Sequence, residues 1–100
     1  MPKNKKKIAS EIGDYISASG IPPCSWYVGV AENARDALFR AHGVIKDDDL
    51  WIYRTAKSSH VAHQGRDRLI RKLKTEGLRD AIDGDPRMVY AYRMAAHTEP

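Results

Sequence analysis

The chain has 100 residues, of which 42% are hydrophobic and 30% charged, and it carries a formal net charge of +4. This balance is typical of a soluble globular protein and excludes an intrinsically disordered chain. No apolar run approaches the roughly 20 residues that a membrane-spanning helix needs. The basic start of the chain lacks the apolar segment of a signal peptide, and the single cysteine, Cys24, cannot form an internal disulfide. We therefore expect a cytoplasmic protein.

The positive charge is concentrated in two parts of the sequence. One lies within the first seven residues and the other lies in 66–79; their basic residues are Lys3, Lys5, Lys6, Lys7, Arg66, Arg68, Arg71, Lys72, Lys74 and Arg79. Two basic clusters on a small domain are typical of proteins that bind a phosphate backbone. A solvated tail and a solvated helix face would produce the same pattern.

The first half of the chain predicts a helix followed by a strand. After a flexible basic tail over 1–4, apolar residues at helical spacing predict an amphipathic helix over about 5–19. The stretch from Ser25 to Ala31 is uncharged and rich in aromatic and β-branched residues, which predicts a buried central strand. Gly29 within it leaves room for a ligand or another backbone. We expect this strand to form the floor of a site.

The second half predicts two further helices and two further strands. Asn33 is a good N-cap for a helix over about 34–42, which Gly43 would end, and residues 50–55 predict a strand. A third helix is predicted from Ser58 or Ser59 to about Lys74, and Gly77 would end it.

The position of Arg66 on the third helix predicts partial burial. It lies on the shoulder of the apolar stripe, at the edge of the core rather than free in solvent. A short segment with Leu78 and Ile82 and a turn over 83–86 then lead to a last strand, Met88 to Met94. The order of elements predicts a single α+β domain over 5–100, a small three-stranded twisted sheet flanked by about three helices.

Several short motifs occur in a recognisable order. Tyr27-Val28-Gly29 precedes a helix that ends in Leu38-Phe39 and His42; Trp51 on a strand and Ala62 on a helix follow. Together they resemble the GIY-YIG nuclease superfamily over about residues 26–92. More narrowly, the C-terminal Tyr90-Ala91-Tyr92 is similar to that of small stand-alone bacterial GIY-YIG-like proteins. The first signature strand is missing before Trp26, and a permuted arrangement would place the C-terminal strand in that position.

The resemblance implies a metal-dependent nuclease site, but two of its charged positions are substituted. Members of the family use a tyrosine to activate water, an arginine to hold the scissile phosphate and a glutamate to bind the metal. Tyr27 matches the tyrosine of the second signature, and His42 matches a histidine often found at the end of the helix. The expected arginine falls on Ala37 and the expected glutamate on Arg66. Metal-dependent cleavage needs both the positive charge of the expected arginine and the negative charge of the expected glutamate. We therefore expect Tyr27 and His42 to be vestigial catalytic residues, with no metal and no cofactor.

We therefore interpret the chain as a catalytically inactive GIY-YIG-like domain that binds nucleic acid or a complex that handles nucleic acid. We expect no membrane partner. The residues expected to contact nucleic acid are Lys5, Lys6, Lys7, Arg35, Arg40, Arg66 and Arg71. One alternative is a phage or mobile-element inhibitor that blocks a host defence complex such as CRISPR by protein contact. Another is a nuclease with relocated catalytic groups, with Arg40 or Asp67 as replacements.

Two further patterns have a structural explanation as well as a functional one. The strand aromatics could stack on bases, although aromatic residues on strands more often belong to a core. They are Trp26, Trp51, Tyr53, Tyr90 and Tyr92. His60 and His63 have a spacing that zinc sites use, and Cys24 or His42 could join them, but the ordinary interpretation is a pair of exposed histidines on a polar helix face.

Overall fold

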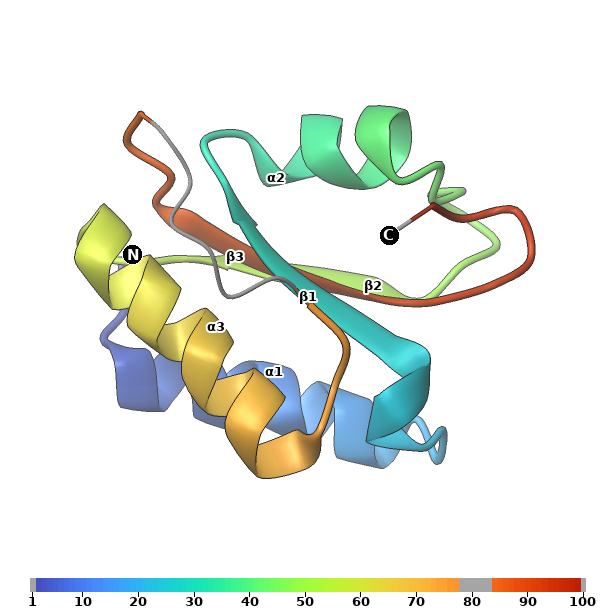
Figure 1. The fold of residues 1–100 in the computed structure, drawn as a ribbon, viewed down its shortest axis with the longest axis horizontal. Helices are drawn as coiled ribbons and strands as arrows, with labels where there is room; N and C mark the ends of the chain where they lie inside the picture. Colours follow the sequence, from blue (N-terminus) through green and yellow to red (C-terminus); the bar gives the residue numbers. More distant parts are fainter. Residues whose placement is uncertain (1, 78–83, 100) are drawn as a thin grey trace.

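Residues 2–77 and 84–99 are described by a computed structural model (Figure 1). The helices and strands occur in the predicted order and have the bounds α1 (Lys5–Ala18), β1 (Trp26–Ala31), α2 (Ala34–Asp36), β2 (Trp51–Thr55), α3 (Ser59–Leu73) and β3 (Met88–Arg93). A 3-10 turn, η1 (Pro23–Ser25), precedes β1, and a π-helical segment, η2 (Ala37–Ala41), continues α2. The predicted α+β class, with a three-stranded sheet and three helices, is confirmed.

The sheet is antiparallel with the strand order β1-β3-β2, so the prediction that the first strand is central was wrong. β3 is the central strand: its Tyr92 is paired with Tyr27 on one side and with Trp51 on the other. β1 is nevertheless buried because Glu76 closes its outer edge. Val28 N donates to Glu76 O at 2.9 Å, and Glu76 N donates to Trp26 O at 2.8 Å. The C-terminal strand β3 lies beside β1.

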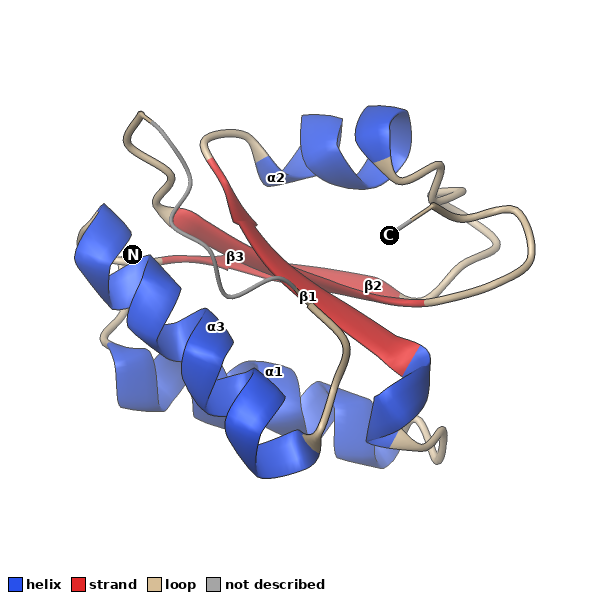
Figure 2. Ribbon diagram, in the orientation of Figure 1, coloured by secondary structure: helices blue, strands red, loops and turns tan. Residues whose placement is uncertain are grey.

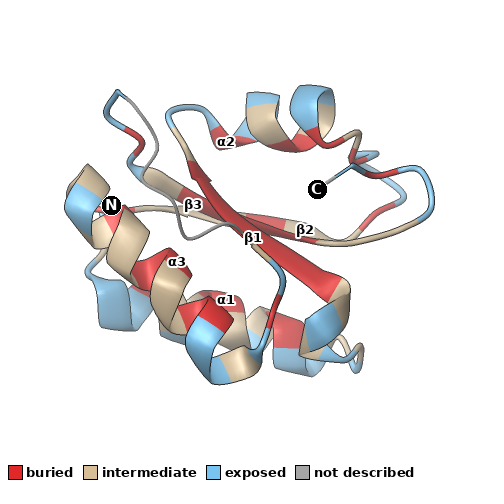
Figure 3. Cartoon of the chain, viewed as in Figure 1, coloured by how far each residue is buried: buried red, intermediate tan, exposed pale blue. Residues whose placement is uncertain are grey.

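Both faces of the sheet are covered, by different helices. α1 and α3 pack on one face, and α2 with η2 lies over the other (Figure 2). Successive residues of a strand point to opposite faces. Trp26, Val28 and Val30 therefore join the core under α1 and α3, whereas Tyr27 joins the core under α2. The buried positions of α1 and α3 face the sheet (Figure 3).

Capping groups explain where the helices begin and end. The Asn4 side chain accepts from Lys7 N at 2.9 Å, and Ser58, rather than Ser59, caps α3 by accepting from Val61 N at 3.2 Å. α3 ends at Leu73, close to the predicted end, and its C-cap is Lys74 in the left-handed region (φ 64°) rather than Gly77. Gly77 is required for another reason, because a Cβ atom there would collide with the carbonyl oxygen of Val28 on β1.

Lys3, within the predicted flexible tail over 1–4, pairs with the segment that follows β2. Lys3 N donates to Thr55 O at 2.9 Å, and Lys57 N donates to Lys3 O at 3.2 Å. Lys3 thus forms a short parallel bridge beside the end of β2. The reason is that the N-terminal segment can satisfy backbone groups on an otherwise open sheet edge.

Several predictions lie outside the described residues. These are the segment with Leu78 and Ile82, Arg79 of the second basic cluster, and Asp83 at the start of the predicted turn. Within the described residues, no helix has both the length and the apolar character needed to cross a membrane.

Candidate functional site

Tyr27 and His42, the two predicted vestigial catalytic residues, lie together on the α2 side of the sheet. Their ring centroids are 5.0 Å apart. Tyr92 stacks on Tyr27 with centroids 5.4 Å apart, and the Tyr90 ring lies 5.4 Å from that of His42. We call these four residues the aromatic cluster. They meet because Tyr27 and Tyr92 are direct cross-strand partners and Tyr90, two residues from Tyr92, faces the same side of the sheet.

Hydrogen bonds determine the tautomer of His42. Its Nδ1 lies 2.5 Å from the main-chain oxygen of Glu99, which can only accept, so Nδ1 carries the proton. In the neutral ring Nε2 is then an acceptor, and the Tyr90 hydroxyl donates to it at 2.7 Å. The Tyr92 hydroxyl donates to Glu99 O at 3.3 Å, and Glu99 N donates to His42 O at 2.8 Å. The C-terminal residues thereby cover the aromatic cluster.

The space above Gly29 is occupied by protein rather than by a ligand. A Cβ atom at this position would lie 2.5 Å from Cζ of Tyr90 and closer still to its hydroxyl oxygen. Tyr27 is 7% exposed, His42 9%, Tyr90 5% and Tyr92 0%. The glycine therefore serves close packing of a neighbouring ring, and the predicted floor of an open site is instead part of a core.

Burial also determines the protonation of the two tyrosines on β3. It raises the pKa of the Tyr90 and Tyr92 hydroxyls well above the ordinary value of 10.0, and the neighbouring Tyr27 acts in the same direction. The positive charge of Arg66 opposes this rise at Tyr90. Both hydroxyls therefore stay protonated in the alkaline range where an ordinary tyrosine ionises, and they act as hydrogen-bond donors rather than as bases.

Arg66 is 2% exposed, so it is buried more deeply than the predicted position at the edge of the core. It belongs to the buried stripe of α3 with Ala62, Gly65 and Leu69, which faces the sheet. Its Nε donates to Asp67 Oδ1 at 2.9 Å. A buried guanidinium whose charge acts on the aromatic cluster creates positive potential, whereas a hard divalent cation needs carboxylate oxygens.

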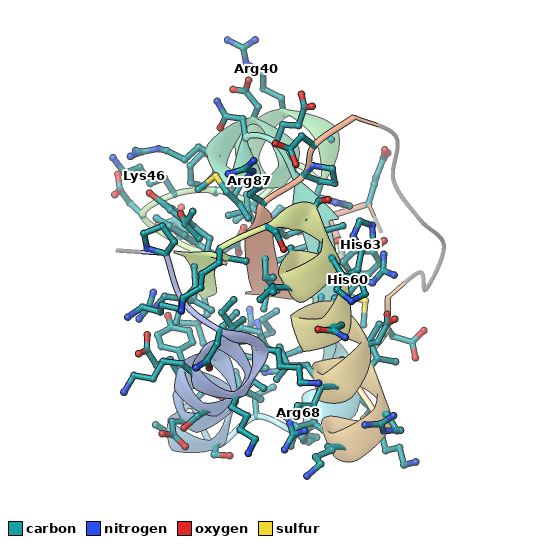
Figure 4. All side chains as sticks on the ribbon, turned by 90° about the vertical axis from the view of Figure 1, so that its left-hand side faces the viewer. Arg40, Lys46, His60, His63, Arg68 and Arg87 are labelled. Atoms are coloured by element: carbon teal, nitrogen blue, oxygen red, sulfur yellow. The ribbon has the colours of Figure 1, made fainter. Side chains whose placement is uncertain are left out.

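The predicted zinc alternative receives no support from the side-chain arrangement. His60 and His63 lie close together on α3 (Figure 4), and His63 Nδ1 is 2.7 Å from Ser59 O. His42 lies on the opposite side of the sheet, and Cys24 is exposed in η1. No group of three or more histidine, cysteine, aspartate or glutamate side chains suited to a metal ion occurs within 2–77 and 84–99.

A basic groove runs between α1 and α3, on the face of the molecule opposite the aromatic cluster. Two adjoining hollows of about 280 and 250 Å³ form it, and Arg68 lines both. The charged residues that line it are Lys5, Lys6, Arg68, Arg71, Lys72, Asp14 and Asp67. Five cations thus face two carboxylates, one of which, Asp67, already accepts from Arg66. The floor includes the small residues Ala9 and Gly13, which let the helices approach closely.

The structure separates the residues predicted to contact nucleic acid. Lys5, Lys6 and Arg71 lie in the basic groove. Lys7 instead reaches Glu11, 3.8 Å away. Arg35 and Arg40 are exposed on α2 and η2, beyond the other face of the sheet, where Arg40 Nε lies 3.9 Å from Asp36 Oδ1.

Sequence reasoning placed Arg68 and Lys72 in the second basic cluster without singling them out as contact residues, and it did not identify Tyr90 and Tyr92 as partners of His42. Arg68 and Lys72 are four residues apart and therefore share one helix face, a signal that was available in the basic cluster. Tyr90 and Tyr92 alternate on a strand and so must face the same side. Strand pairing determines that they face the side of the sheet on which His42 lies, and no local sequence pattern reveals this pairing.

No protein-family model, curated protein or solved structure matches this chain.

Proposed function

We propose that this protein binds the phosphate backbone of nucleic acid through the groove between α1 and α3 and does not cleave it. The observation that carries the proposal is the excess of exposed cations in that groove, where Lys5, Lys6, Arg71 and Lys72 are exposed and Arg68 is half-buried. Cations on both walls of a groove can neutralise successive phosphates along one strand.

The placement of the lysines supports binding rather than helix stability. α1 carries Lys5, Lys6 and Lys7 in its first turn and has no acidic residue there. The N-terminus of a helix already has a partial positive charge, so cations in the first turn are unfavourable for the helix itself. Their positive potential adds to that of the helix and favours an approaching anion.

The proposed lack of cleavage rests on the composition of the aromatic cluster and its surroundings. Ala37 supplies no positive group for a phosphate, and Arg66 supplies a guanidinium where the resemblance implies a metal-binding carboxylate. The four side chains are also buried beneath the C-terminal residues, so a phosphodiester has no direct access to Tyr27.

The proposal is tested by fluorescence anisotropy with labelled duplex and single-stranded DNA at several salt concentrations. Arg68→Glu should weaken binding by about tenfold or more and reduce the salt dependence, because a phosphate contact is lost and a repulsive charge is added. Arg40→Glu is the matched control, since it makes the same charge change on the far side of the sheet (Figure 4). It should change the affinity by less than about twofold.

Two results would contradict the proposal. The first is equal weakening by Arg40→Glu and Arg68→Glu, which would show that only net charge matters. The second is the absence of binding at low salt, which would favour an inhibitor that acts by protein contact. Cleavage is checked separately by incubating DNA with Mg²⁺ or Mn²⁺, and metal-dependent cutting that Tyr27→Phe abolishes would show an active site.

A further inference from the structure

A second surface feature, on the other side of α1, is a trough along the outer edge of β2. Two hollows of about 470 and 290 Å³ share Tyr15 and together extend from Leu50 to Arg54. Among the described residues that line the trough, none is acidic. The strand order places β2 at the edge of the sheet, so this side of the strand is not covered by another strand.

The aromatic residues of the trough are held in fixed positions while remaining partly accessible. Trp51 and Tyr53 are half-exposed, and their rings are nearly parallel, 7° apart, with centroids 6.1 Å apart. Trp51 is fixed on one side by Phe39, which meets it edge-on at 5.1 Å. Its indole Nε1 also donates to Lys46 O at 2.9 Å. Such a platform loses little conformational freedom when it binds a flat ligand.

Backbone groups at the same edge are directed outward. Leu50 O accepts from Arg93 N and Ala56 N donates to Arg87 O, so the even-numbered residues of this segment bond to β3 or its extension. Peptide groups alternate along a strand, and those of Trp51 and Tyr53 therefore point away from the sheet. Thr55 confirms this alternation, because its carbonyl accepts from Lys3 N on the outer side.

A cluster of positive charge lies at one end of the trough. Arg54, Lys3 and Lys7 surround the single carboxylate of Glu11, with N–O distances of 2.6, 3.3 and 3.8 Å. The hydrogen bond from Arg54 is the main cause that lowers the pKa of Glu11, so this carboxylate is ionised at neutral pH. Three cations against one anion leave excess positive charge at this end, on the α1 side of the β2 edge, whereas the Trp51 and Tyr53 rings lie on its α2 side.

We propose that this trough binds an unpaired nucleotide of single-stranded nucleic acid, with the base on Trp51 and Tyr53 and the phosphate at Lys3, Lys7 and Arg54. Flat rings on one side of an open strand edge and excess positive charge on the other complement a base joined to a phosphate that spans the edge. The inference rests on the proposed nucleic-acid binding and extends it. Lys5, Lys6 and Lys7 share the first turn of α1, so one strand can pass from the basic groove to the trough around the start of this helix.

Tryptophan fluorescence tests this proposal directly, because the chain has two tryptophans in different environments. Trp26 is fully buried, whereas Trp51 lines the trough. Titration with a short oligothymidylate should quench the fluorescence of the unmodified protein and of Trp26→Phe. The signal of Trp51→Phe, which comes from Trp26 alone, should not change.

Affinity measurements on Tyr53 provide a second test with its own control. Tyr53→Leu should weaken oligothymidylate binding by about fivefold or more and leave duplex binding unchanged, while Tyr53→Phe, which keeps the ring, should bind normally. Unchanged fluorescence and unchanged Tyr53→Leu affinity, with binding still sensitive to Arg68→Glu, would overturn the trough but leave the proposed function intact. Failure of both DNA forms to bind would instead refute the proposed function.

Discussion

Replacement of Gly29 by alanine should be severely destabilising, because the Tyr90 ring already occupies the space of the new methyl group. The added Cβ would lie 2.5 Å from Cζ and 3.0 Å from Cε2 of Tyr90, far inside normal contact distances. The ring cannot move freely, since its hydroxyl donates to His42 Nε2 and the residue is 5% exposed.

The expected loss of stability has two parts. Overpacking of a well-packed core costs roughly 1–3 kcal/mol. Displacing the Tyr90 hydroxyl also leaves His42 Nε2 buried without its donor, which costs about 1–3 kcal/mol. We therefore expect the free energy of unfolding to fall by about 2–6 kcal/mol, a large part of the roughly 5–15 kcal/mol typical of a domain. The melting temperature should fall by about 8 °C or more, at about 4 °C or more per kcal/mol.

Urea denaturation followed by circular dichroism measures this effect. Gly13→Ala is the control: its Cβ would lie 3.6 Å from Leu73 Cδ1, an ordinary contact, and alanine in a helix should stabilise by about 0.5–1 kcal/mol. A double-mutant cycle with Tyr90→Leu isolates the collision, because the shorter side chain makes room for the methyl group. A loss below about 0.5 kcal/mol for Gly29→Ala, or the same loss in the Tyr90→Leu background, would refute the reasoning.

Three further predictions concern buried polar groups. Because the pKa of Tyr92 is raised, the folded state retains a proton that the unfolded chain releases above about pH 10. The free energy of unfolding therefore falls as the pH rises further. Tyr92→Phe should flatten this alkaline decline, measured as the midpoint of urea denaturation at each pH. At Asp49, burial would raise the pKa, but hydrogen bonds from His97 and from the Ile45 amide outweigh it and lower the pKa. The contribution of Asp49 to the free energy of unfolding is complete above its unfolded pKa of about 3.8 and is lost as the pH falls through the lower folded value. Asp49→Asn should therefore flatten the loss of stability at acid pH. An unchanged dependence of stability on pH would contradict this. The buried Trp26 Nε1 has no hydrogen-bond partner among the described residues, so Trp26→Phe removes an unsatisfied donor and should cost less than about 2 kcal/mol; a larger loss of unfolding free energy would indicate a partner.

The helices, the strands and much of their burial could be predicted from sequence because these features depend on neighbours within a few residues. Asn4 and Ser58 cap helices through amides three residues away, and the pattern from Trp26 to Ala31 correctly indicated a buried strand. The basic clusters were equally visible. The sequence did not reveal that these basic residues divide into a groove, an ion-pair cluster and a buried arginine.

Tertiary packing decided which of these residues meet. β3 became the central strand, and Tyr90 came to lie over Gly29, because strand order depends on contacts between residues about 60 positions apart in the chain. Arg66 was predicted at the edge of the core, and it is buried because the face of α3 that carries it packs against the sheet. Likewise, only the packing of α1 beside α3 brings Lys6 and Arg68 to one groove, since periodicity defines the faces of a helix but not the neighbour that each face will contact.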